Sequence, residues 1–252
     1  MMGEPVSAQQ GSGVGTMPQS ASTLSVDEIQ TVSPALGRYA QEHVFGDLWR
    51  RPQLSPRDRS IVTVSILIAR NQGFDLKHYV NLALDNGVTP TEVSEIITHL
   101  AFYSGWSNAM SAIAVTRDVF AERSITADQL PAASPELLPL DEGAERQRAT
   151  GVEANVGPIS PGLVKFTADP LFLDLWQRPG LRPRDRSLVT VSSLIASGQS
   201  AQVTYHLNRA MNNGLTAEEA GELVAHSAFY AGWPNAFSAS TVVGEVLRSR
   251  PK

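Results

Sequence analysis

Cysteine is absent from the 252 residues of this chain. Its absence excludes disulfide bonds, thiolate metal ligands, cysteine nucleophiles and dithiol redox chemistry. No apolar run reaches the ~18–20 residues that a membrane-spanning helix requires, so we expect no membrane segment. The formal net charge of −5 at pH 7 provides no general basic field, and we therefore expect no nucleic-acid partner.

The N-terminal segment 1–23 lacks both the cationic start and the apolar stretch of a secretory signal. Its small and polar residues predict a disordered tail. Together with the missing membrane segment, this composition predicts a soluble protein of the cytoplasm.

Histidine spacing argues against a metal centre. The five histidines include neither a His-x-x-x-His nor a His-x-His pair. Glu222 and His226 are one helical turn apart and His206 could join them, but this set supplies at most three N/O ligands. We therefore expect no metal and no other cofactor.

The chain does contain a long internal repeat. The segment DLWRRPQLSPRDRSIVTVSILIA, from Asp47, lies without a gap over DLWQRPGLRPRDRSLVTVSSLIA, from Asp174. At the same offset THLAFYSGWSNAMSA, from Thr98, matches AHSAFYAGWPNAFSA, from Ala225. We place repeat 1 at residues 24–125 and repeat 2 at 150–252, with a Pro-rich, acidic linker at 126–149. Two homologous units on one chain are expected to pair about a pseudo-two-fold axis, as in a homodimer.

Each repeat is predicted to be helical. In repeat 1 we expect helices over 59–70, 75–85 and 108–123, with another that starts at Thr89-Pro90-Thr91-Glu92, a capping-box sequence. The β-branched residues at 61–64 make a buried strand the alternative over 59–70. No hairpin or alternating pattern occurs, so the predicted fold class is all-α.

Three stretches of repeat 2 resemble a known family. RDRSLVTVSSLIA, then YHLNRAMNNGLT from Tyr205, then AFYAGWPNA are together similar to the carboxymuconolactone decarboxylase family, and repeat 1 shares the likeness. The resemblance implies an antiparallel helical hairpin in each unit and an assembly of six units. A two-unit chain would then form a trimer, so we expect a homo-oligomer.

The resemblance implies one of two chemistries. The alkylhydroperoxidase D type is a thiol peroxidase that uses Cys-x-x-Cys-x-x-x-His and an upstream Glu. Aligned on His206, its cysteine positions are Gln199 and Gln202 here, and its Glu position is Ser187. Peroxidase chemistry requires sulfur and is excluded, which leaves the decarboxylase type. Tyr79 occupies the position of His206 in repeat 1, so the two sites are not expected to be equivalent.

Decarboxylation beside an unsaturated lactone leaves a dienolate. The enzyme must hold carboxylates, stabilise the enolate oxygen and protonate carbon. His206 is the expected proton donor, because the family motif has a histidine there and histidine titrates near neutrality. Spacing predicts that Glu222, His226, Tyr230 and Trp233 share a helix face, as would their copies in repeat 1. The expected catalytic residues are His206, His226 and His99; the expected substrate-binding residues are Arg184, Arg186, Arg57, Arg59, Glu222, Glu95, Tyr230, Trp233 and Tyr79.

Structural roles are the alternatives for several of these residues. His226 and His99 could bond to Glu222 or to the other repeat, Arg57 and Arg59 could form an ion-pair network with Asp58, and Tyr230 and Trp233 could simply pack. The chain is thus predicted to be a carboxy-lyase for a small anionic organic substrate. An isomerase or another enolate-type enzyme on the same scaffold, or a non-catalytic oligomeric binding protein, are the alternatives.

Overall fold

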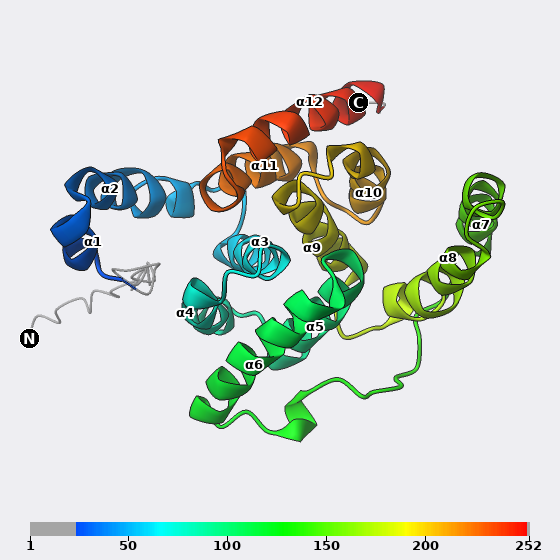
Figure 1. Cartoon of the computed structure of the whole chain (residues 1–252), viewed down its shortest axis with the longest axis horizontal. Helices are drawn as coiled ribbons and strands as arrows, with labels where there is room; N and C mark the ends of the chain where they lie inside the picture. The colour runs from blue at the N-terminus through cyan, green and yellow to red at the C-terminus, as the bar shows by residue number, and fades with distance from the viewer. Residues whose placement is uncertain (1–23, 251–252) are drawn as a thin grey trace, which may run out of the picture.

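The computed structural model describes residues 24–250, which contain twelve α-helices and no strand (Figure 1). The predicted all-α class is therefore confirmed. The expected tail at 1–23 lies outside the described residues.

From residues 34 and 161 onward, the two repeats contain the same order of elements. Repeat 1 contains α1 Val26–Val32, α2 Pro34–Tyr39, a π-helical segment Ala40–Phe45, a 3-10 turn Leu48–Arg50, α3 Pro56–Ala69, α4 Gly73–Asp85, α5 Pro90–Tyr103 and α6 Trp106–Glu122. Repeat 2 contains α8 Pro161–Phe166, a π-helical segment Thr167–Phe172, a 3-10 turn Leu175–Gln177, α9 Pro183–Ala196, α10 Ser200–Asn212, α11 Ala217–Ala231 and α12 Trp233–Ser249. Between them, α7 Glu142–Val156 begins inside the expected linker.

Local sequence explains where the helices begin and end. Thr89 accepts a hydrogen bond from the Glu92 backbone N–H, and the Glu92 carboxylate accepts one from the Thr89 N–H, so the predicted capping box is present. Thr216 and Glu219 form the same box at α11. At the end of α11, Gly232 has φ +92°, a conformation that favours glycine and separates α11 from α12.

Helix α3 is a helix throughout, so the strand alternative for this segment is wrong. It is buried on all sides, and an all-round apolar helix is typical of a core position. Ser60, Thr63 and Ser65 are also buried there, and each hydroxyl donates to the carbonyl oxygen four residues earlier. These bonds satisfy the hydroxyl groups inside the core.

The repeats share one core. Helix α3 packs along α9, while α5 of repeat 1 packs on α9 and α11 of repeat 2 packs on α3. Figure 1 shows the pair α5–α6 and the pair α11–α12 on opposite sides of α3 and α9, with α1–α2 and α7–α8 at opposite ends. Each repeat therefore completes the other, as the expected pseudo-two-fold pairing requires.

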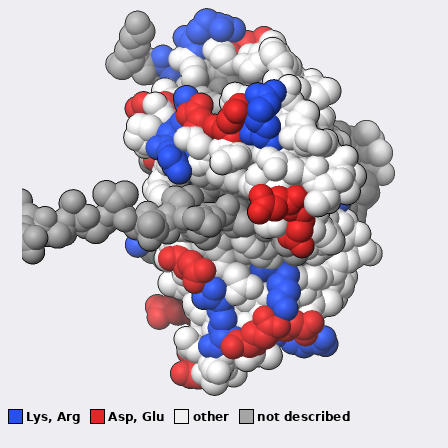
Figure 2. Space-filling model, turned by 90° about the vertical axis from the view of Figure 1, so that its left-hand side faces the viewer, with Lys and Arg blue, Asp and Glu red and all other residues white. Residues whose placement is uncertain are grey.

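The surface is mixed in charge. On the face in Figure 2, acidic and basic side chains are interspersed among neutral ones. Within residues 24–250 no helix is both long enough and apolar enough to cross a membrane.

Candidate active site

His226 is held in a fixed hydrogen-bond chain between the two repeats. Arg59 Nη1 lies 3.2 Å from His226 Nδ1, and a guanidinium can only donate, so Nδ1 accepts. Nε2 then carries the proton and donates to Thr63 Oγ1 at 2.8 Å, while Thr63 donates to the Arg59 carbonyl oxygen. Both ring nitrogens are occupied, and the ring is completely buried.

His99 is held in the same way by the other repeat. Its Nδ1 faces Arg186 Nη1 at 3.4 Å and its Nε2 lies 2.7 Å from Thr190 Oγ1. Burial, and then the neighbouring guanidinium, lower the pKa of both His99 and His226 well below the usual value. Each ring is therefore neutral at neutral pH, and neither has exposed surface through which a substrate could reach it.

Two carboxylates compensate the buried guanidinium groups. Glu222 accepts from Arg59 Nη2 at 2.8 Å and from Arg51 Nε at 2.9 Å. In the copy, Glu95 accepts from Arg186 Nη2 and Arg178 Nε, both at 2.8 Å. Each carboxylate and its arginines belong to opposite repeats, so these ion pairs join the units.

Arg57 and Arg184 also pair across the repeats. Arg57 Nη2 lies 2.9 Å from Asp185 Oδ2, and Arg184 Nη2 lies 2.9 Å from Asp58 Oδ2. Their guanidinium groups also contact Glu92 and Glu219, respectively. Both arginines, expected to bind substrate, are thus surrounded by carboxylates of the protein itself.

The position of Tyr79 and His206 distinguishes the two repeats. Around Tyr79, Trp49 Nε1 donates to Tyr230 Oη at 2.8 Å, and Tyr79 Oη lies 3.0 Å from the same oxygen. This chain ties Tyr79, which is only 4% exposed, into the packed interior. The Tyr79 hydroxyl group is therefore hydrogen-bonded inside the protein, where the equivalent position of repeat 2 has His206.

At the equivalent position around His206, Trp176 Nε1 donates to Tyr103 Oη at 2.9 Å, just as Trp49 donates to Tyr230. His206 stands where Tyr79 stands in repeat 1, stacked on Trp176 with ring centroids 6.1 Å apart. Its side chain is 8% exposed, and within the described residues Nδ1 has no hydrogen-bond partner. Unlike the ring nitrogens of His99 and His226, this nitrogen of His206 is buried without a hydrogen bond.

A cavity of about 780 Å³ opens beside His206. It lies between α7 and α10, and its lining includes His206, Arg209, Arg148, Tyr205 and Phe172. The lining combines these aromatic rings and nitrogen donors with the Asp141 carboxylate and several apolar side chains. A cavity of this size can hold a small organic molecule.

Arg209 is the unusual cation of this cavity. Within residues 24–250 its guanidinium makes no hydrogen bond or ion pair, and its Nε is buried without a partner. The guanidinium instead lies over the Trp176 ring, with Cζ 4.2 Å from the centroid. A guanidinium has the geometry to bind a carboxylate through two N–H groups.

The pKa of His206 is lowered to about 4, because the ring is buried and because Arg209 lies nearby. The ring is therefore neutral at neutral pH before a ligand binds. An anion bound beside it would oppose both effects and raise that pKa.

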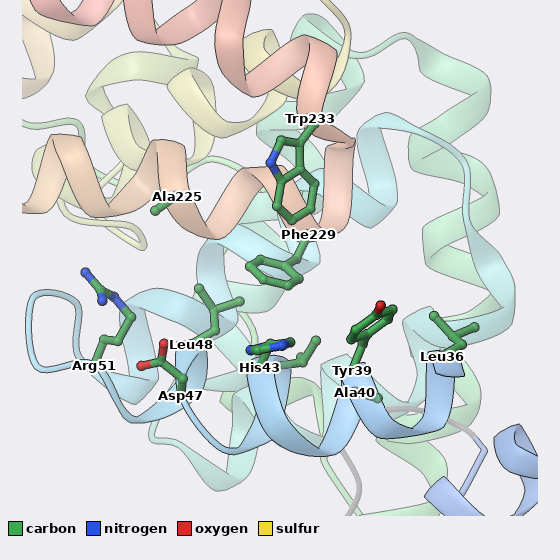
Figure 3. Close-up of a pocket in the computed structure, with 11 residues that line it drawn as sticks. Leu36, Tyr39, Ala40, His43, Asp47, Leu48, Arg51, Ala225, Phe229 and Trp233 are labelled. Carbon is green, nitrogen blue, oxygen red and sulfur yellow. The ribbon is translucent and has the colours of Figure 1, made fainter. Parts of the chain in front are cut away.

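A separate pocket of about 800 Å³ contains Trp233, which was expected in the substrate site. Figure 3 shows Phe229 and Trp233 opposite Leu36, Tyr39 and His43. The prediction that Trp233 shares a helix face with Glu222, His226 and Tyr230 is wrong, because α11 ends at Ala231 and Trp233 begins α12.

Sequence reasoning missed Arg209 and Arg148. Arg209 could have been found, because its repeat-1 counterpart is Leu82, so two chemical differences lie one helical turn apart at 206 and 209. Arg148 has no such signal, since it lies in the segment 126–149 that we expected to be a linker. In the described part of the chain, no three His, Asp or Glu side chains are grouped to hold a metal ion.

The described residues thus form an all-α protein of two homologous units with a cavity that a histidine and two arginines help to line. Residues 34–118 and 161–245 both match the model of the carboxymuconolactone decarboxylase family. These segments make up more than half of the chain, which therefore belongs to that family.

Two relatives are decarboxylases. A 4-carboxymuconolactone decarboxylase from Acinetobacter baylyi is 40% identical over 75 residues, which cover 30% of this chain and 56% of that protein. A nitrosuccinic acid decarboxylase from Metarhizium robertsii is 33% identical over 76 residues, which cover 30% of this chain and 53% of that protein. The chain thus spans about half the length of the curated relatives that it matches.

Proposed function

We propose that this chain is a decarboxylase that acts on a small carboxylated acid in the cavity beside His206. The observation that carries the proposal is that His206 and Arg209 line one cavity, and that His206 Nδ1 and Arg209 Nε are buried without a hydrogen-bond partner in the described chain. The two decarboxylase relatives support the reaction class. Their names point to a carboxymuconolactone-like or nitrosuccinate-like acid as the substrate.

The reaction breaks the carbon–carbon bond to a carboxylate. CO₂ leaves, and the electron pair moves into the neighbouring acceptor, which for a lactone gives a dienolate. The Arg209 guanidinium stabilises the developing negative oxygen, since a charged donor fixed in a partly buried site acts strongly. A proton then returns to carbon.

His206 supplies that proton in the proposed mechanism. Because its pKa is about 4 in the free protein, it must first gain a proton when the anionic substrate binds. Substrate charge beside the ring favours this protonation, so the acid forms only where it is needed. We assign His99 and His226 structural roles, because hydrogen bonds occupy both nitrogens of each ring.

The first experiment measures CO₂ release by purified chain from 4-carboxymuconolactone and, separately, from nitrosuccinate. We expect turnover of at least one acid, reduced about 10²- to 10⁴-fold by His206→Gln, the range for loss of a general acid. The matched control His43→Gln changes an exposed histidine outside this cavity and should leave the rate unchanged.

Other outcomes identify the alternatives. A product without CO₂ loss, identified by NMR, would indicate an isomerase or another enolate reaction. Tight binding of these acids without any product would indicate a binding protein. Either result would remove the proposed decarboxylation.

We also propose that the chain forms a homo-oligomer. Large apolar side chains are exposed at equivalent positions of both repeats: Phe102 and Phe229, Trp106 and Trp233, and Met110 and Phe237. Clusters of this kind on a soluble surface favour association. The family resemblance favours a trimer of two-unit chains. Light scattering should therefore give about three times the 27.1 kDa chain mass, and a stable monomer would contradict this proposal.

A further inference from the structure

Helix α7 forms a wall of the cavity although it lies outside both family-matched segments. Asp141 caps its start by accepting from the backbone N–H groups of Gly143 and Ala144. Figure 1 places α7 beside α8 at one end of the molecule, and Arg148 and neighbouring residues of α7 line the cavity. The helix between the repeats thus contributes to a site in repeat 2.

Arg148 is held with one side of its guanidinium occupied. Nε and Nη2 donate to the two oxygens of Glu145, while Nη1 is buried and has no hydrogen-bond partner in residues 24–250. The side chain is only 7% exposed, and Cζ lies 4.3 Å from the centroid of the Phe172 ring. Glu145 and Phe172 therefore fix the orientation of a guanidinium that still has donors available.

The cavity thus contains two arginines on different helices. Arg209 shares α10 with His206, one turn away, and both Arg209 and Arg148 contact the Phe172 ring from their own helices. Two guanidinium groups on separate walls can bind two carboxylates of one molecule. Of the two arginines, only Arg209 lies next to His206, the proposed proton donor.

The roles of the two arginines follow from the charge flow of the reaction. Charge leaves the departing carboxylate, so a guanidinium bound to that group would stabilise the starting state more than the transition state. Arg148 therefore suits a carboxylate that stays on the substrate, and binding there orients the molecule against His206.

We propose that Arg148 is a specificity-determining residue that binds the non-reacting carboxylate of the substrate. This inference rests on the proposed function for the location of the site, but it concerns binding and not turnover. The helix between the repeats thereby sets the preference of the cavity for acids with a second carboxylate.

The test uses succinate and monomethyl succinate, which differ by one carboxylate charge, in calorimetric titrations of the full chain. We expect the wild-type chain to bind succinate about 10- to 100-fold more tightly than its monoester, the range for one charge-assisted hydrogen-bonded contact. Arg148→Met should abolish this preference while retaining binding of the monoester. Arg148→Lys should restore part of it.

Arg146→Met is the matched control, because Arg146 is on the same helix with its side chain 73% exposed. It removes the same charge from α7 and should keep the wild-type preference. Equal loss of preference in both variants, an unchanged preference in Arg148→Met, equal weakening of both ligands, or no binding of succinate by the wild-type chain would each overturn the inference. A chain that binds succinate through Arg148 yet releases no CO₂ would remove only the proposed decarboxylation.

Discussion

Protonation of His206 should lower the stability of the fold. Its pKa is about 4 in the folded chain against 6.5 for an unperturbed histidine, so between these values the unfolded chain binds the extra proton. The contribution of the neutral His206 ring to the free energy of unfolding is therefore fully present above about pH 6.5 and is lost as pH falls toward 4.

The size of this loss follows from the two pKa values. Between pH 7.5 and 5.0, titration of His206 lowers the free energy of unfolding by about 2 kcal/mol, since one pKa unit corresponds to ~1.4 kcal/mol. His206→Gln lacks this contribution, whereas His99, His226 and the carboxylates contribute equally in both proteins. The wild-type chain should therefore lose about 2 kcal/mol more than the variant.

Urea denaturation followed by far-UV circular dichroism at the two pH values measures this difference. Parallel loss of stability in the wild-type chain and His206→Gln would refute the reasoning, because it would mean that His206 titrates normally in the folded protein. Addition of succinate should raise the pKa of His206 in the folded chain, which NMR titration of the ring can follow.

Three further substitutions test separate parts of the structure. Arg59→Met removes the buried guanidinium that Glu222 and His226 Nδ1 share and should cost roughly 3–5 kcal/mol of unfolding free energy in urea titrations, whereas the exposed control Arg117→Met should cost less than ~0.5 kcal/mol. Arg209→Met should lower kcat/KM for CO₂ release about 10²- to 10³-fold with little change in melting temperature; an unchanged rate would exclude Arg209 from the reaction. Tyr79→Phe removes one hydrogen bond to Tyr230, so it should cost about 1 kcal/mol of stability and leave the CO₂ rate unchanged.

Much of the fold could be predicted because its signals are local. The capping box at Thr89, the glycine after α11 and the match between repeats fix helix starts, a helix end and the two-unit organisation. The β-branched run in α3 was ambiguous because propensity does not decide a segment that is buried on every side.

The site was harder to predict because it depends on contacts between the repeats. The spacing of Glu222, His226 and Tyr230 in the sequence correctly predicted that they share a face of α11. It could not predict that Arg59 of the other repeat contacts Glu222 and His226. Repetition of a histidine identifies a position of importance, but the same pattern fits a buried structural ring. Arg148 could not be predicted because it lies in the segment 126–149 that we expected to be a linker.

We propose that CO₂ release takes place beside His206 and does not require Tyr79, whose hydroxyl group is bonded to Tyr230. CO₂ release by His206→Gln and by Tyr79→Phe is compared, with both variants shown to be folded by circular dichroism. We expect a rate loss of about 10²-fold or more for His206→Gln and a wild-type rate for Tyr79→Phe. Equal rates in the two variants, or a loss confined to Tyr79→Phe, would contradict it.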